Sequence, residues 1–161
     1  MFDVAIEQAT TRPMPPGPRE LRPLPARRRR PPAARVALLH GGYCLAMGLW
    51  PVVSLKTFEM ATGPKLEGWL TKGVGVCLAN IGSAIGAAGA LGKVARELRV
   101  LGASTALSFA AMDFWYAGVR RRISRVYLVN GAVQLGFAAA WGYATWREKR
   151  DASRLPEAAF A

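Results

Sequence analysis

The sequence reads VALLHGGYCLAMGLWPVVSL over residues 36–55, without a single Asp, Glu, Lys or Arg. At ~1.5 Å per residue these 20 residues form a helix of about 30 Å, which equals the hydrocarbon thickness of a bilayer. Buried helices of water-soluble proteins rarely run so far without a charge. The stretch therefore predicts a membrane-spanning helix.

Three further apolar segments of similar length follow it. Residues 73–92 and 126–146 are uncharged, and residues 100–119 carry one charge, at Asp113. Short charged loops separate the four segments. We expect an all-α fold, an integral membrane four-helix bundle over residues 35–147. The alternative is a water-soluble all-α bundle with glycine-rich helices, which the length of the uncharged segments disfavours.

The segments that flank the bundle differ from it in composition. Residues 1–34 hold eight of the eleven prolines and the run Arg27–Arg30. Proline removes backbone donors and like charges repel, so we expect a disordered tail with polyproline II character. Residues 148–161 form a short C-terminal tail. A signal peptide over 27–47 is disfavoured because the apolar run is long and lacks a small-residue cleavage site.

The net charge of +12 first suggests a nucleic-acid or membrane partner. Eight of the 22 basic residues lie in the first 35 positions, and most others border apolar segments. A nucleic-acid-binding domain would instead present a basic face on a folded module. We therefore expect the lipid bilayer as partner, with anionic headgroups bound by Arg27, Arg28, Arg29 and Arg30, and no nucleic acid.

The distribution of Lys and Arg predicts the orientation in the membrane. With both termini inside, 15 basic residues lie inside and 7 outside, which favours cytoplasmic termini. The tail decides this count, because without it the two sides are equal. The loop after the third segment carries four arginines within residues 120–125 and is unusually basic for an outer loop.

The second segment carries a GxxxG motif at Gly82 and Gly86, within a stripe of small residues. Small residues allow two membrane helices to approach closely. We expect this stripe to pack within the bundle; the alternative is the face of a homo-oligomer.

Polar residues inside the segments are the candidate functional residues. Tyr127, Asn130 and Gln134 recur at i, i+3 and i+7 and share one helix face, and Asp113, Tyr116 and Arg120 show the same spacing. Asn80 lies at a comparable depth in the second segment. We expect one polar cluster in the outer half of the bundle, formed by Asp113, Tyr116, Asn80, Tyr127, Asn130 and Gln134, with Arg120 above it.

Asp113 has two interpretations. An ionisable residue inside a span is costly unless it is paired, protonated or in a wet cavity. The functional interpretation is an ion, proton or ligand site open to the outside. The structural interpretation is a network in which Asp113 pairs with Arg120 and Asn130 ties the fourth helix to the second.

Two cysteines and one histidine also fall in the apolar segments. His40 and Cys44 share a helix face, but Cys77 would lie about 10 Å away in depth, too far for a shared metal or a disulfide. We expect no metal and no cofactor, with His40 as a capped interfacial residue near Tyr43; the alternative is a lone axial haem ligand.

Residues 36–146 resemble small bacterial membrane proteins with four transmembrane helices. The stretches that carry the resemblance are LHGGYCLAMGLWPVVSLKTFEMATGPKLEGWLTKGVG and RRISRVYLVNGAVQL. In size and topology the chain is also similar to the broad DoxX-like group, an analogy at the level of the fold. The resemblance implies four spans in a bacterial cytoplasmic membrane and no particular activity.

No motif for a named reaction is present, and the chain lacks a paired acid set or an activated nucleophile, so we do not expect an enzyme. The leading hypothesis is a non-enzymatic membrane module, either an accessory subunit or a binder of a small ligand or lipid at the polar cluster. The alternative is a small transporter or proton-coupled carrier, which would act as a homo-oligomer because four helices enclose little pore.

Overall fold

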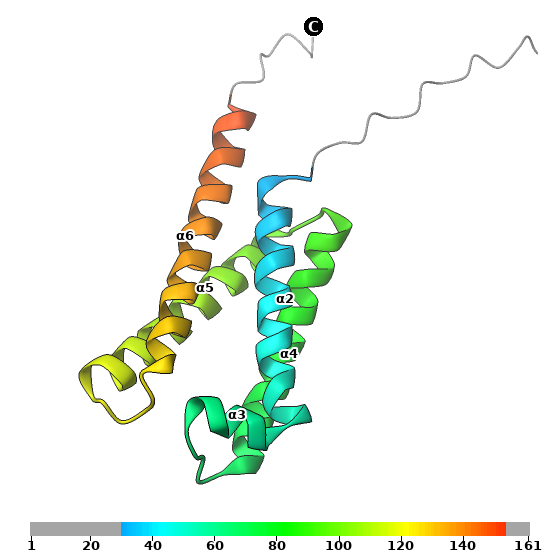
Figure 1. The fold of residues 1–161 in the computed structure, drawn as a ribbon. Coiled ribbons are helices and arrows are strands. Elements are labelled where there is room, and N and C mark those ends of the chain that lie inside the picture. The colour runs from blue at the N-terminus through cyan, green and yellow to red at the C-terminus, as the bar shows by residue number, and fades with distance from the viewer. Residues whose placement is uncertain (1–29, 154–161) are drawn as a thin grey trace, which may run out of the picture.

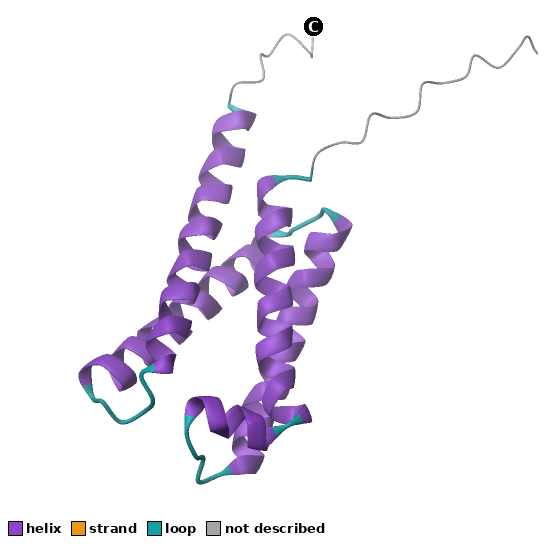
Figure 2. Cartoon of the chain, in the orientation of Figure 1, coloured by secondary structure: helices purple, strands orange, loops and turns teal. Residues whose placement is uncertain are grey.

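A computed structural model describes residues 30–153, which are almost entirely helical and contain no strand (Figure 2). The all-α prediction is confirmed for this range. The predicted disordered tail and the contacts of Arg27, Arg28 and Arg29 lie outside the described residues, as does most of the C-terminal tail. The elements are α2 (Pro32–Val53), α3 (Leu55–Thr62), α4 (Gly68–Leu91), α5 (Arg96–Asp113), the π-helical turn η1 (Phe114–Val119) and α6 (Val126–Ala152).

Local sequence explains where these helices begin and end. Pro32 is the first residue of α2, a position where its missing N–H is not needed. Ser54 ends α2 in an extended conformation, and its hydroxyl accepts a hydrogen bond from the N–H of Thr57 in the first turn of α3. Gly63, with φ 91°, ends α3, and Gly92, with φ 70°, ends α4. The first loop therefore contains the short helix α3.

The long helices form two antiparallel hairpins, α2–α4 and α5–α6 (Figure 1). The first residues of α2 and the last residues of α6 lie at one end of the molecule, which we call the terminal end. The helix α3 and the loop between η1 and α6 lie at the other end. Contact between the hairpins is mainly between α2 and α6.

Glycines allow α2 and α4 to touch through their backbones. A Cβ atom at Gly48 would lie 2.5 Å from the Gly75 carbonyl oxygen, and one at Gly82 would lie 2.5 Å from the Leu45 nitrogen. Gly41 meets both Gly82 and Gly86. Such closeness leaves no room for a side chain. The GxxxG stripe of α4 is therefore occupied by α2 of the same chain.

The interior is built from small residues and the surface from large apolar ones. Alanine makes up most of the buried apolar set, in which Ile85 and Trp141 are the only large members among the described residues. Large side chains such as Leu39, Val53 and Leu91 point outward, with 67%, 82% and 78% of their surface exposed. A protein in water would bury these groups, because each exposed large side chain forfeits about 1.5–3 kcal/mol of transfer free energy.

Among the described helices, α2 and α4 are long and apolar enough to cross a membrane. Only 33% of the apolar window of each is buried within the chain, whereas the core helix of a soluble protein is mostly buried. The other two predicted spans do not meet the same criterion. Helix α5 carries Arg96, Glu97, Arg99 and Asp113, and the apolar part of α6 is diluted by polar residues such as Asn130 and Gln134.

Candidate functional site

The polar residues singled out in the sequence lie around a cavity between the two hairpins, at the end opposite the terminal end. This inter-hairpin cavity has a volume of about 590 Å³. Helices α2, α3, α4, α5 and α6 and the turn η1 all contribute to its wall. Most of the lining is apolar, and its charged or strongly polar members are Tyr43, Thr62, Lys65, Thr71, Asp113, Tyr116, Tyr127, Asn130 and Gln134.

A chain of two hydrogen bonds crosses the wall of the cavity and joins three helices. Asn130 of α6 donates through its Nδ2 to Asp113 Oδ2 of α5 at 2.6 Å. Its own Oδ1 accepts from the hydroxyl of Tyr43 in α2 at 2.5 Å. Gly131 allows this approach, because a Cβ there would lie 3.1 Å from Asp113 Cβ. Asn130 thus links α5 to α2, not to α4 as the structural interpretation assumed.

The carboxyl group of Asp113 is largely buried, with 5% of the residue exposed. No hydrogen bond to Oδ1 is found within residues 30–153, yet no buried side-chain oxygen there lacks a partner. Oδ1 must therefore keep access to the cavity that Asp113 lines. The ion pairs of the described residues are Arg99–Glu148 and Arg147–Asp151, so Asp113 has no basic partner in this part of the chain.

The pairing of Asp113 with Arg120, which belonged to the structural interpretation, is not found among the described residues. Directly after Asp113 the chain widens into η1, where the Arg120 N–H bonds to the Trp115 carbonyl five residues earlier at 2.8 Å. A π-turn shifts the register by one residue relative to an α-helix, and such turns are frequent at functional sites. The shift takes Arg120 away from the face of Asp113, and its guanidinium lies 5.8 Å from the centre of the Trp115 ring.

The other expected members of the cluster divide into two groups. Tyr116, Tyr127 and Gln134 line the inter-hairpin cavity together with Asp113 and Asn130. Asn80 does not, because its side chain is exposed on the outer face of α4. Its neighbour Ala79 is the residue that packs against Gly48 of α2. The sequence indicates how deep Asn80 lies along the helix, but not in which direction around the helix axis its side chain points.

Lys65, which sequence analysis did not single out, lies at the loop side of the cavity. Its Nζ is 5.1 Å from the centre of the Tyr127 ring and 5.8 Å from that of Phe58. The same ammonium donates to the Thr62 carbonyl at 3.4 Å. Two aromatic rings of the cavity wall therefore already accept a cation, an attraction that strengthens when water is excluded.

Toward the terminal end, a second hydrogen-bonded group closes the space between α2 and α6. Trp141 Nε1 donates to His40 Nδ1 at 3.1 Å, and His40 Nε2 lies 3.3 Å from Gln134 Oε1. Phe137 stacks on the His40 ring at 4.5 Å between centres. His40 is fully buried between α2 and α6, with both ring nitrogens at hydrogen-bond distance from side chains of α6. The sequence spacing could have indicated this contact, because Gln134, Phe137 and Trp141 lie on the same face of the helix as Asn130.

The two cysteines are far apart in environment. Cys44 is buried beside Gly82 in the α2–α4 contact, and Cys77 is exposed on α4. No three His, Cys, Asp or Glu side chains gather at metal-ligand distance in the part of the chain that the structure describes.

Comparison with known proteins gives no relative. No family model, curated protein or solved structure matches the chain.

Proposed function

We propose that the chain is a four-span membrane protein of a bacterial cytoplasmic membrane, with both termini cytoplasmic. The observation that supports this proposal is the reversed distribution of size, with mainly alanine and glycine inside and most Leu and Val side chains outside. Packing of small residues drives helix association in lipid, where burial of large apolar groups brings no gain. The membrane placement, including the spans over α5 with η1 and over α6, is also what the resemblance noted above implies.

Cysteine labelling tests the membrane placement and the orientation. In a background of Cys44→Ala and Cys77→Ala, single cysteines replace Lys56 in the first loop and Ser153 after α6. An impermeant maleimide added to intact cells should react with the first and not with the second. Labelling of Ser153→Cys alone would reverse the orientation, and full release of the chain by alkaline carbonate would remove the membrane placement.

We propose further that the protein binds a small amphipathic ligand in the inter-hairpin cavity. A volume of about 590 Å³ lies within the range of small-molecule sites. Such sites combine an apolar lining with a few fixed polar groups. Here the fixed group is Asp113, held by Asn130 and Tyr43, with Oδ1 left for a ligand.

The chemistry of this site favours a ligand with a cationic or hydrogen-bond-donating head. A buried carboxylate without a basic partner is stabilised by a donor or a cation. The aromatic rings of Trp50, Phe58, Tyr116 and Tyr127 offer faces on which an organic ammonium binds well. The Lys65 ammonium already makes this kind of contact with the rings of Phe58 and Tyr127.

A matched pair of probes tests this proposal, because tetraphenylphosphonium and tetraphenylborate share one shape and carry opposite charge. The purified full chain in detergent should bind the cation and not the anion. Asp113→Asn should weaken binding of the cation at least about tenfold, since the Coulomb attraction between the carboxylate and the phosphonium is lost. Asp151→Asn, an exposed acid at the other end, is the control and should change nothing.

A second variant keeps the test valid if Asp113→Asn fails to fold. Ala61→Trp places a ring in the cavity without touching Asp113, and Ala87→Trp adds the same ring on an exposed part of α4 outside the cavity. Loss of binding in the first variant alone supports the site. Equal binding of both probes by all variants contradicts it.

A carrier is the second candidate, and one observation favours it. The cavity lies toward the end that carries α3, and the packed group of His40, Gln134 and Trp141 separates it from the terminal end. A carrier that opens alternately to the two sides has such a state. Vesicles that contain the protein should then accumulate a labelled quaternary ammonium that does not cross lipid unaided, such as choline, whereas a binder holds it only in proportion to protein.

A further inference from the structure

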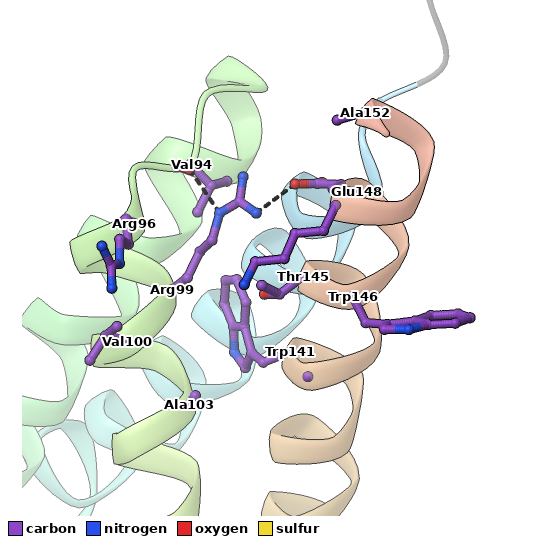
Figure 3. Close-up of a pocket in the computed structure, with 12 residues that line it drawn as sticks. Val94, Arg96, Arg99, Val100, Ala103, Trp141, Thr145, Trp146, Glu148 and Ala152 are labelled. Atoms are coloured by element: carbon purple, nitrogen blue, oxygen red, sulfur yellow. Dashed lines mark hydrogen bonds and ion pairs between the residues drawn. The ribbon is translucent and has the colours of Figure 1, made fainter. Parts of the chain in front are cut away.

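A second concavity lies at the terminal end, between the first turns of α5 and the last turns of α6 (Figure 3). This terminal groove has a volume of about 920 Å³ and shares no residue with the inter-hairpin cavity. Its rim is charged, through Arg96, Arg99, Glu148 and Lys149. Its floor is mainly apolar, through Val100, Ala103, Trp141 and Gly142.

The rim and the floor lie on opposite sides of the expected membrane boundary. The spans predicted from the sequence begin at 100 and end at 146, so the rim residues fall outside them and the floor residues inside. An occupant of the groove must therefore be polar at one end and apolar at the other. A soluble anion would leave the floor empty, and a hydrocarbon would leave the rim without a partner.

The charge of the rim specifies the sign of the polar end. Arg99 Nη1 lies 2.5 Å from Glu148 Oε2, and the two side chains face each other across the groove (Figure 3). Arg96 and Lys149 form no ion pair with any described residue. Three cations against one carboxylate leave a surplus of positive charge, which attracts an anionic headgroup.

We infer that the terminal groove binds an anionic phospholipid. Its phosphate lies between Arg96 and Lys149, and one acyl chain runs along the floor past Ala103 and Gly142. The inference rests on the membrane placement proposed above and is independent of the inter-hairpin ligand. It differs from the expected attraction of headgroups by the run Arg27–Arg30, because it requires a defined groove.

Native mass spectrometry of the full chain in detergent measures this binding. Phosphatidylglycerol should bind in preference to phosphatidylcholine with the same acyl chains. The double change Arg96→Gln, Lys149→Gln should weaken phosphatidylglycerol binding about twenty-fivefold, about fivefold for each charge. Arg121→Gln with Arg122→Gln removes two charges at the other end of the molecule and should have no effect.

Two glycines of α6 provide a test that changes no charge. A Cβ at Gly142 or at Gly136 meets nothing within 4 Å, so both accept a larger side chain, but only Gly142 lines the groove. Gly142→Leu should abolish retention of phosphatidylglycerol by occupying the path of its acyl chain. Gly136→Leu should retain the lipid like the unchanged protein.

Three results would overturn the inference. The first is a loss of phosphatidylglycerol binding in the Arg121, Arg122 control as large as that in the Arg96, Lys149 variant. The second is equal binding of phosphatidylglycerol and phosphatidylcholine. The third is displacement of the lipid by millimolar glycerol 3-phosphate, which would indicate a site for the headgroup without an acyl chain. A protein that resists carbonate extraction yet retains no phosphatidylglycerol refutes the groove and leaves the membrane placement intact.

Discussion

The indole Nε1–H of Trp141 donates to Nδ1 of His40 at 3.1 Å, and this bond fixes where the imidazole carries its proton. An indole nitrogen can only donate, so Nδ1 must be the acceptor and Nε2 must carry the hydrogen. Nε2–H then donates to Gln134 Oε1 at 3.3 Å. We predict the neutral Nε2–H tautomer, which ¹⁵N chemical shifts of labelled His40 will identify; an Nδ1–H signal would contradict this arrangement.

Trp141→Phe should destabilise the protein. The change removes the only donor to His40 Nδ1 among the described residues and leaves space at a side chain that is 1% exposed. The expected loss in free energy of unfolding is about 1–3 kcal/mol, measured by chemical denaturation in mixed micelles. Trp146→Phe is the control, because that ring is half exposed and should change stability little.

Tyr43→Phe should loosen the inter-hairpin site without removing its charge. The hydroxyl that bonds Asn130 Oδ1 is lost, so the amide that holds Asp113 becomes free to rotate. We expect stability to fall by about 1 kcal/mol and tetraphenylphosphonium affinity to fall severalfold. Tyr143→Phe, at an exposed ring on the same helix as Asn130, should leave both quantities unchanged.

Lys65→Met should strengthen binding of tetraphenylphosphonium. The Lys65 ammonium occupies the faces of Tyr127 and Phe58 and repels a second cation. Its removal should raise the affinity by about three- to tenfold, as measured by calorimetry. Lys56→Met, in the exposed first turn of α3, is the matched control. A weaker affinity in Lys65→Met would mean that this lysine helps to hold the ligand.

Gly82→Leu should separate α2 from α4. The new side chain would meet the backbone of Gly41 and Leu45 at distances that no shift of a flexible group relieves. We expect a loss of at least about 3 kcal/mol, or no folded protein, whereas Gly73→Leu at an open position on α4 should be tolerated. Heating followed by gel filtration separates the two outcomes.

The positions of the long helices could be predicted because a long stretch without charged residues is visible in the sequence itself and does not depend on how the helices pack. The expected segment 36–55 corresponds to α2 (Pro32–Val53), and the segment 126–146 lies within α6 (Val126–Ala152). Helix α6 continues beyond the apolar segment. Its last turns carry charged residues such as Arg147, which are solvated by water and therefore allow the helix to extend past that segment.

The candidate site was harder to predict, because it depends on direction around the helix axis. Asp113 and Asn130 are hydrogen-bonded, as the predicted cluster requires. Asn80 lies one residue beyond the position that faces α2, so its side chain is exposed, and the π-turn moves Arg120 away from Asp113. Tyr43 was not assigned to the cluster because no spacing within one helix shows which face a partner helix will cover. Lys65 depends on a loop conformation and had no signal in the sequence.

The last helix completes the first. Pro31, the residue before α2, makes no side-chain hydrogen bond to the start of the helix. The Ala33 N–H instead donates to Oε1 of Glu148 at 3.0 Å, 115 residues later in the chain. During synthesis this donor stays without its acceptor until α6 has been made. A chain that stops at residue 147 should therefore leave the Ala33 N–H without this acceptor, and we expect it to be less stable and more rapidly degraded in cells than the full chain.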